Sequence, residues 1–258
     1  MPDMVFTQTA DELWEEYLSQ LWKNFFLQSG VNLKTGVIVE IGPGRRYKIG
    51  NALAKLGFTG TLYIVEPDNV AVKEVVHKCR ELMPNATIVP VAKTLQECST
   101  YIELEVDAIV ANHLLDDILM NEYINAAHLN EVFNRGEPTY NLLKEAWPKL
   151  LSDKAKLVKL MAKLKQDLNN LLKYLNPKIV IFSQYKSYYF TKMFEGKEVT
   201  PDTVAIEFLS VIRNEFGKPT GTVKTALAMP ADIPPNLDKV AVIQNTQLAD
   251  FWMINQLQ

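Results

Sequence analysis

The stretch Val37-Ile-Val-Glu-Ile-Gly-Pro-Gly44 decides the fold class of this chain. A short run of β-branched residues leads into Glu40 and then into two glycines separated by one residue. Near-continuous apolar runs of this kind are typical of strands buried in a parallel sheet, and glycine lets the backbone turn sharply and approach a ligand closely. We therefore expect a ligand at the carboxyl end of this strand.

A second buried-type strand, at residues 61–66, ends in the carboxylate Glu66. Glu66 follows Gly42 by roughly the 20 residues that separate a glycine turn from the acid that binds ribose hydroxyls. A further apolar run at 106–111 leads into Asn112 and the sequence HLLDD. In a parallel sheet the carboxyl ends of the strands share one edge, so these residues should meet there.

The pattern Glu40-x-Gly42-x-Gly44, then Glu66, then the segment 106–116 resembles the class I S-adenosylmethionine-dependent methyltransferases. The resemblance covers residues 33–117 and implies S-adenosylmethionine as cofactor, with S-adenosylhomocysteine as product. Arg46 stands where this family has a third small residue. The cofactor-binding residues that the resemblance implies are Glu40, Gly42, Gly44, Glu66, Pro67, Ala92 and Asn112.

The remaining pattern predicts a doubly wound α/β fold, because apolar β-branched runs alternate with helical periodicity. Five parallel strands are expected at 37–41, 61–66, 86–91, 106–111 and 178–183. Helices are expected at 46–57, 68–83, 93–102, 114–127, 137–151, 152–175 and 201–216. Two late strands, at 222–229 and 239–245, would complete a Rossmann-like, mostly parallel sheet of seven strands whose last strand is antiparallel, as in the family.

Two helical additions to this fold are predicted. A capping-box sequence, Thr9-Ala-Asp-Glu12, precedes an aromatic stripe at helical spacing that ends at Gly30. We interpret residues 1–32 as an N-terminal helical cap, which either packs against the main domain or covers its ligand site. Residues 33–258 form the methyltransferase-like domain, and a helical insert at about 128–150 would serve as a lid or as a contact in a homodimer.

Composition narrows the class of protein and of partner. The chain has 258 residues, 48% of them hydrophobic and 22% charged, and its formal net charge is −3. This charge gives no sign of a nucleic-acid or anionic-membrane partner. The two cysteines, Cys79 and Cys98, do not suggest a disulfide framework, and no secretory signal or long apolar run is visible. We expect a cytoplasmic protein with a small-molecule substrate.

A nicotinamide or flavin dinucleotide is the competing cofactor for a glycine turn. Its fingerprint needs a third glycine where this chain has Tyr47, and its pyrophosphate would be repelled by Glu40. The ammonium and sulfonium of S-adenosylmethionine suit a carboxylate instead. Arg45 and Arg46 complicate this charge argument, and two interpretations stay open: they bind an acidic group of cofactor or substrate, or they are exposed or ion-paired.

The acceptor side of the site is expected at His113, Asp116 and Tyr185, which are our candidate catalytic residues. His113 would act as a base or orient the substrate, and Tyr185 follows the fifth strand, where an aromatic face attracts cations. A structural interpretation competes for Asp116 and Asp117, because acidic side chains also stabilise the N-terminus of a helix. No His or Cys spacing indicates a metal site, and the motifs of base-flipping methyltransferases are absent.

The sequence thus predicts an S-adenosylmethionine-dependent enzyme that transfers a methyl group to a small-molecule nucleophile. Methyl transfer requires alignment and exclusion of water more than chemical side chains. Three alternatives stay open. They are transfer of the aminocarboxypropyl group from the same cofactor, as in nicotianamine-synthase-like enzymes, a non-catalytic binding module, and a dinucleotide oxidoreductase.

Overall fold

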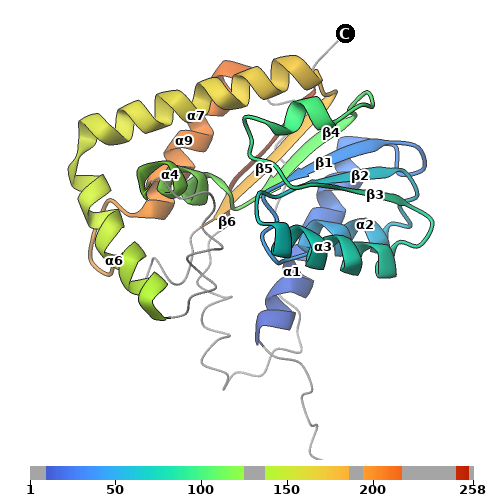
Figure 1. Cartoon of the computed structure of the whole chain (residues 1–258), viewed down its shortest axis with the longest axis horizontal. Coiled ribbons are helices and arrows are strands. Elements are labelled where there is room, and N and C mark those ends of the chain that lie inside the picture. Colours follow the sequence, from blue (N-terminus) through green and yellow to red (C-terminus); the bar gives the residue numbers. More distant parts are fainter. Residues whose placement is uncertain (1–9, 125–136, 186–193, 217–247, 256–258) are drawn as a thin grey trace, which may run out of the picture.

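A six-stranded sheet runs through the computed structural model, which describes residues 10–124, 137–185, 194–216 and 248–255. Its order is β3-β2-β1-β4-β5-β6. The first five strands run parallel, and β6 pairs antiparallel with β5 (Figure 1). The strands are β1 (Val37–Ile41), β2 (Thr61–Val65), β3 (Thr87–Val91), β4 (Ala108–Asn112), β5 (Ile179–Tyr185) and β6 (Leu248–Asn255).

The parallel part of this sheet confirms the predicted α/β fold. The chain winds from β1 outward to β3 and then returns to β4 on the other side of β1, so the order reverses between β1 and β4. Ligands bind in open α/β sheets outside the carboxyl ends of the strands at such a reversal. The predicted strands at 222–229 and 239–245 lie outside the described residues, and β6 occupies a segment where we expected no strand.

Strand β1 is buried along its whole length because helices cover both of its faces. Val37, Val39 and Ile41 belong to the hydrophobic cluster on one face of the sheet, while Ile38 belongs to the cluster on the opposite face. Successive side chains of a strand alternate between faces, so Glu40 points toward the same face as Ile38. A carboxylate therefore enters the core at the end of the central strand.

Three helices cover the face of Ile38: α1 (Ala10–Ser29), α2 (Lys48–Lys55) and α3 (Asn69–Leu82) (Figure 1). The aromatic stripe of α1 is buried, with Trp22, Phe25 and Phe26 each at most 1% exposed. Trp22 and Phe25 meet edge to face with ring centroids 5.4 Å apart, which is a favoured aromatic geometry. This confirms that α1 packs against the main domain, and its coverage of a ligand stays a prediction.

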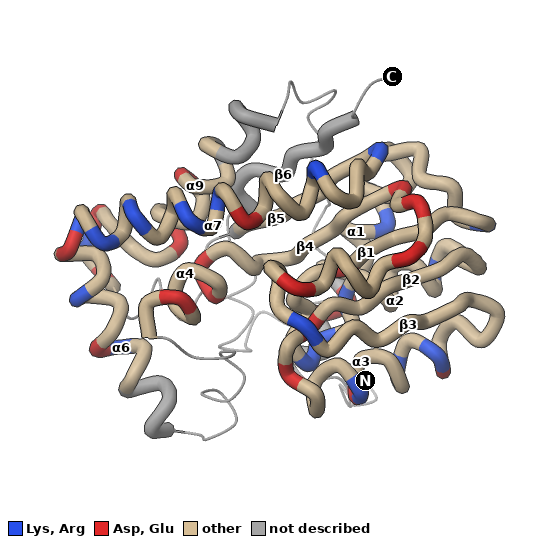
Figure 2. Tube along the Cα trace, turned by 45° about the horizontal axis from the view of Figure 1, so that its top comes forward, with Lys and Arg blue, Asp and Glu red and all other residues tan. Residues whose placement is uncertain are grey.

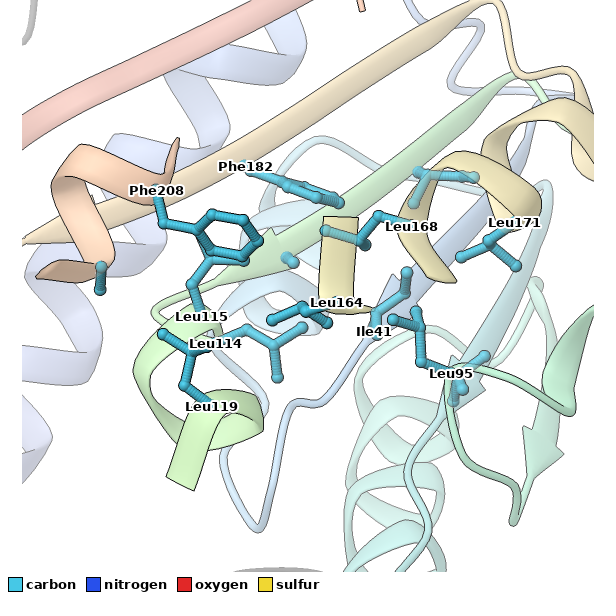
Figure 3. Close-up of a cluster of buried hydrophobic side chains, with 14 of the residues drawn as sticks. Ile41, Leu95, Leu114, Leu115, Leu119, Leu164, Leu168, Leu171, Phe182 and Phe208 are labelled. Carbon is cyan, nitrogen blue, oxygen red and sulfur yellow. The ribbon is translucent and has the colours of Figure 1, made fainter. Parts of the chain in front are cut away.

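The opposite face is covered by α4 (Leu115–Ile124), α6 (Glu137–Ser152), α7 (Lys154–Leu175) and α9 (Pro201–Phe216). Figure 3 shows how leucines of α4 and α7 meet Ile41 of β1, Phe182 of β5 and Phe208 of α9. The helical spacing of the buried leucines of α7 predicted this face correctly. They are Leu160, Leu164, Leu168, Leu171, Leu172 and Leu175.

The predicted helix at 93–102 is wrong. The structure forms only a short 3₁₀ turn, η1 (Cys98–Tyr101), after a tight turn in which the carbonyl of Thr94 accepts the N–H groups of Glu97 and Cys98. Leu95, Cys98 and Ile102 bury their side chains against α7 at a spacing that imitates a helix. The segment is therefore a loop anchored by three apolar side chains.

Lysines recur along α7, most of them exposed, and the helix also contains Asp167; Figure 2 marks the charged positions along its length. Lys163 bonds to Glu122 of α4 at 2.6 Å and lies 3.6 Å from Asp167. This charged face of α7 is therefore exposed to solvent.

Both cysteines, Cys79 and Cys98, are buried free thiols. Within the described ranges, no helix has both the length and the apolarity that crossing a bilayer would require.

The close packing of α2 on α3 depends on Gly50, and this gives a first prediction. A Cβ at Gly50 would lie 2.4 Å from the Sγ atom of Cys79. Gly50→Ala should lower the free energy of unfolding in urea by about 1–3 kcal/mol, although alanine is the better helix former. Gly50→Ala combined with Cys79→Ala should lose less than the sum of the two single changes. Additive losses would contradict the contact.

Candidate functional site at the carboxyl edge of the sheet

The carboxyl ends of the parallel strands are held in register by backbone hydrogen bonds that continue beyond the strands. These bonds run from the N–H of Gly42 to the carbonyl of Val65 at 2.8 Å, from Glu66 to Val91 at 3.1 Å and from His113 to Ser183 at 2.9 Å. The residues that directly follow β1, β2 and β4 are therefore each bonded to the neighbouring strand at this edge. The sequence predicted this convergence from strand direction alone.

The turn after β1 has the backbone conformation that its glycines indicated. Gly42 has φ +63° and Gly44 has φ +61°, in the left-handed region that side chains disfavour. A Cβ at Gly42 would lie 2.2 Å from the Cδ1 atom of Leu114, which follows His113 after β4. Both glycines are thus required by geometry, and the turns after β1 and β4 are in contact.

Glu66 ties this turn to the start of α3. Its carboxylate is 4% exposed; Oε2 accepts the N–H of Gly44 at 3.0 Å, and Oε1 accepts the N–H of Asp68 at 3.0 Å. Asp68 in turn caps α3 by accepting the N–H of Val70 at 2.8 Å, as the sequence predicted. Each carboxylate oxygen has two lone-pair sites, so these bonds leave Glu66 able to accept ligand hydroxyls as well.

Glu40 is a carboxyl group buried to 2% exposure directly before the glycine turn. Burial raises its pKa to about 8, and the nearby cation of Lys48 opposes that rise. Its Oε2 atom has no hydrogen-bond partner among the residues that the structure describes. A buried acceptor without a partner is costly, so the geometry is suited to a ligand that brings a donor or a positive charge.

The two arginines of the turn are engaged in ion pairs, as one of the two interpretations expected. Arg46 contacts Glu15 of α1 at 2.7 Å, and Arg45 lies 3.5 Å from Glu74 of α3. Both arginine side chains are at least 40% exposed, so these pairs contribute little stability. The side chain of Arg46, which stands where the family that the sequence resembles has a small residue, is thus directed toward Glu15 of α1.

Asn112, the last residue of β4, is held by two donors. Its Oδ1 atom accepts the indole N–H of Trp22 at 3.0 Å and the hydroxyl of Ser183 at 3.1 Å. These bonds join helix α1, β4 and β5 at the carboxyl edge. Because two donors fix the amide, its orientation is set before any ligand binds.

His113 adopts a left-handed backbone conformation, φ +52°, which is uncommon for residues other than glycine, although histidine adopts it more often than most. The ring lies between two carboxylates, with Nδ1 3.6 Å from Oδ1 of Asp116 and Nε2 3.8 Å from Oδ1 of Asp202. Both aspartates are buried. The predicted residues His113 and Asp116 are therefore together, and Asp202 joins them.

The acidic character of this edge extends beyond the predicted residues. Gln184 is fully buried and donates from Nε2 to Oδ1 of Asp116 at 2.9 Å. The pKa of Asp117 lies well above its ordinary value, because of burial first and the charge of Asp116 second, while His113 and Lys48 act in the opposite direction. A positive ligand would relieve this concentration of carboxyl groups.

Three other predicted residues are less informative. Pro67 is half-buried and is the second residue after β2. Ala92 is also half-buried and directly follows β3, so both lie at the expected edge of the sheet. Tyr185 is the last residue of β5, and its side chain lies outside the described part of the structure. Their roles stay predictions.

Sequence reasoning missed Asp202 and Gln184. The segment Thr200-Pro-Asp-Thr203 shows the start of a helix, and Thr200 and Thr203 indeed cap each other there. Nothing local indicates that this helix start packs against His113. Metal-ligand spacing in the sequence detects only near neighbours, whereas His113, Asp116 and Asp202 offer ligand atoms within 4.8 Å of one another across α4 and α9.

Comparison with known proteins finds likeness in structure only. No family model matches the sequence, and no curated protein matches it either. The chain is similar to a SAM-dependent methyltransferase from Aquifex aeolicus, with 13% identity over 81% of this chain and 87% of that one and a TM-score of 0.40. It is also similar to an rRNA methylase from Streptococcus thermophilus, with 9% identity over 69% and 73% of the two chains and a TM-score of 0.32.

A third similar structure is the bifunctional kinase-methyltransferase WbdD, with 10% identity and a TM-score of 0.37. The match covers 70% of this chain and 33% of WbdD, so the chain spans about a third of that protein's length. These values describe a partial likeness of fold.

The raised pKa of Glu40 predicts how stability depends on pH. The unfolded chain releases this proton near its ordinary pKa of 4.5, whereas the folded chain keeps it up to about pH 8. Stability is therefore lost as pH rises through this window, by at most about 1.4 kcal/mol per pH unit. Glu40→Gln removes the titration, so the stability of the variant relative to wild type should rise from about pH 5.5 to about pH 8.5.

Urea unfolding at both pH values, without ligand, measures this difference. Other titrating groups cancel in the comparison because both proteins contain them. Glu81→Gln, at an exposed position of α3, is the matched control and should show a much smaller dependence. An unchanged difference for Glu40→Gln between the two pH values would contradict a buried, protonated Glu40.

The left-handed backbone of His113 predicts an unusual order of stability for its variants. His113→Gly should be more stable than His113→Ala by about 1 kcal/mol, because glycine adopts positive φ without strain. At the exposed helical position Lys159 the order should reverse, with glycine about 1 kcal/mol worse than alanine. Urea unfolding of the four variants tests this, and the same order at both positions would refute the strained conformation.

Proposed function

We propose that this chain is an S-adenosylmethionine-dependent methyltransferase that binds its cofactor where the order of the sheet reverses. The observation that carries the proposal is the glycine turn at Gly42 and Gly44, bonded to Glu66 and set among buried carboxyl groups. The turn allows the backbone to approach a ligand, and an acid at the end of the second strand, as Glu66 is here, supports binding of ribose hydroxyls. The surrounding carboxyl groups favour a cationic ligand.

Charge selects between the two cofactor classes that use such a turn. A dinucleotide would bring a pyrophosphate beside the carboxylate of Glu66, at an unfavourable energy of about 1–4 kcal/mol for each pair of like charges, and it would offer no cation to the buried carboxyl group of Glu40. S-adenosylmethionine brings an ammonium and a sulfonium. The Oε2 atom of Glu40, which has no hydrogen-bond partner among the described residues, fits the ammonium. The residues present thus fit S-adenosylmethionine better than a dinucleotide.

In this proposal each predicted residue binds or orients the cofactor. Glu66 accepts the ribose hydroxyls, and the backbone at Gly42 and Gly44 lies against the methionine part. Pro67 and Ala92 border the nucleoside, and Asn112 fixes the floor of the site at the end of β4. The cofactor supplies a methyl group that is already activated on sulfur, so the protein's task is to align the acceptor and exclude water.

The acceptor is proposed to be a small molecule that binds beside His113 and Asp116. A thiolate nucleophile of the protein is disfavoured, because burial raises the pKa of Cys98 to about 12 and raises that of Cys79 further. The formal net charge of −3 gives no electrostatic support for binding nucleic acid. We therefore place the nucleophile on the substrate itself, which His113 and Asp116 would align with the methyl group of the cofactor.

Calorimetric titration with S-adenosylhomocysteine and S-adenosylmethionine tests the cofactor. Saturable binding is expected for wild type and for the control Glu81→Ala, and loss of binding for Glu66→Ala, with folding checked by circular dichroism. Absence of binding to folded wild-type protein at millimolar ligand would refute the proposal. With an acceptor in hand, a product heavier by one methylene distinguishes methyl transfer from aminocarboxypropyl transfer.

Glu40 makes a sharper prediction for the same titration. Near pH 7 a carboxyl group with a pKa of about 8 is mostly protonated, and an ammonium placed beside it would lower that pKa. Binding of S-adenosylhomocysteine should therefore release protons, so the measured heat should depend on the ionisation enthalpy of the buffer. Glu40→Gln should remove this dependence and Glu81→Gln should not. Binding without proton release would place the ammonium elsewhere.

A further inference from the structure

A second polar cluster lies beside the proposed cofactor site and has the composition of a metal site. We call it the histidine-aspartate cluster, and its members come from three parts of the chain that the fold brings together. They are His113 after β4, Asp116 in the first turn of α4, Gln184 in β5 and Asp202 in the first turn of α9. The oxygens and nitrogen of His113, Asp116 and Asp202 lie within 4.8 Å of one another.

The cluster is removed from water. The side chains of Asp116 and Asp202 are each 2% exposed, and that of His113 is 15% exposed. Two carboxylates this deeply buried require compensation by positive charge. A divalent cation bound by both carboxylates would supply that compensation.

Gln184 provides an independent indication that a ligand belongs here. Its side chain is 0% exposed, and its Nε2 atom donates to Asp116 at 2.9 Å, which anchors the amide within the cluster. Its Oε1 atom has no hydrogen-bond partner among the described residues. A fully buried amide oxygen that has no donor among the described residues, in a side chain bonded to Asp116, is an acceptor available to a cation.

We propose that the histidine-aspartate cluster binds one divalent transition-metal ion through one imidazole nitrogen, two carboxylate oxygens and the amide oxygen of Gln184. Such an ion needs its ligand atoms about 2.0–2.2 Å away, so the side chains must close in by roughly 1 Å or less. The mixed nitrogen and oxygen set suits Mn²⁺, Fe²⁺ or Zn²⁺ better than Mg²⁺ or Ca²⁺, which favour oxygen ligands.

The position of the cluster gives the ion a role, which rests on the proposed function. His113 directly follows Asn112, at the acceptor side of the proposed methyl-transfer site. A metal ion there would hold a hydroxyl or enol oxygen of the acceptor and lower its pKa, so that its proton passes to water. The oxygen then takes the methyl group from the cofactor's sulfur, and S-adenosylhomocysteine leaves as the neutral thioether. The inferred substrate class is therefore a small molecule whose acceptor is a hydroxyl or enol oxygen.

The test titrates the full-length protein, stripped of metal with a chelator, with Mn²⁺ and follows the electron paramagnetic resonance signal of the free ion. One saturable site is expected in wild type and in the matched control Asp167→Asn, which changes a half-buried aspartate of α7. Asp202→Asn and Gln184→Met should each weaken binding at least about 10-fold. Zn²⁺ should compete, and Mg²⁺ should compete poorly.

Two further measurements keep this test independent of folding and of the cofactor. Electron spin echo modulation of Mn²⁺ bound to wild type should show coupling to one histidine nitrogen, and a signal without nitrogen coupling would overturn the assignment. Glu66→Ala should lose binding of S-adenosylhomocysteine but keep binding of Mn²⁺. A failure of the cofactor proposal can therefore be distinguished from a failure of the metal proposal. Absence of saturable Mn²⁺ and Zn²⁺ binding in wild type would overturn the proposal and leave His113 as a candidate base.

Discussion

The carboxylate of Glu66 is the interaction on which the carboxyl edge of this protein depends. With one oxygen it accepts the N–H of Gly44, and with the other it accepts the N–H of Asp68. It thereby fixes the turn after β1 to the helix after β2, two elements that the sheet alone would not hold at a defined distance. A hydrogen bond to a charged acceptor is stronger than one between neutral groups, so this small contact has a large structural effect.

The same edge shows how a fold sets the electrostatics of a site. The fold brings Glu40, Glu66, Asp116 and Asp202 to the carboxyl edge of the sheet, and burial increases the cost of negative charge there. Lys48 and His113 oppose part of this cost. An arrangement of this kind repels phosphates and favours cations, which makes the choice of ligand a property of the whole edge rather than of one residue.

Much of this arrangement could be predicted from the sequence, because the relevant signals are local. The apolar run before Glu40 predicts a buried strand, and the spacing of Gly42 and Gly44 predicts a turn with positive φ; both predictions hold. Asp202 could not be found in this way, because its position beside His113 depends on how α9 docks on the sheet. The loop that contains η1 was misjudged for the opposite reason, since its anchoring side chains imitate helical spacing. Local patterns thus predicted the turn after β1 better than the surroundings of His113.

The buried carboxyl group of Glu40 also has a consequence for the amount of folded protein in a cell. A buried acceptor without a hydrogen-bond partner lowers the free energy of unfolding, and a ligand that binds only the folded state restores it in proportion to the logarithm of its concentration. Small changes in that free energy alter how much of a protein escapes proteolysis. With the edge built as it is around Glu40, the amount of folded protein would follow the supply of its cationic ligands, so that scarcity of those ligands would shorten its lifetime.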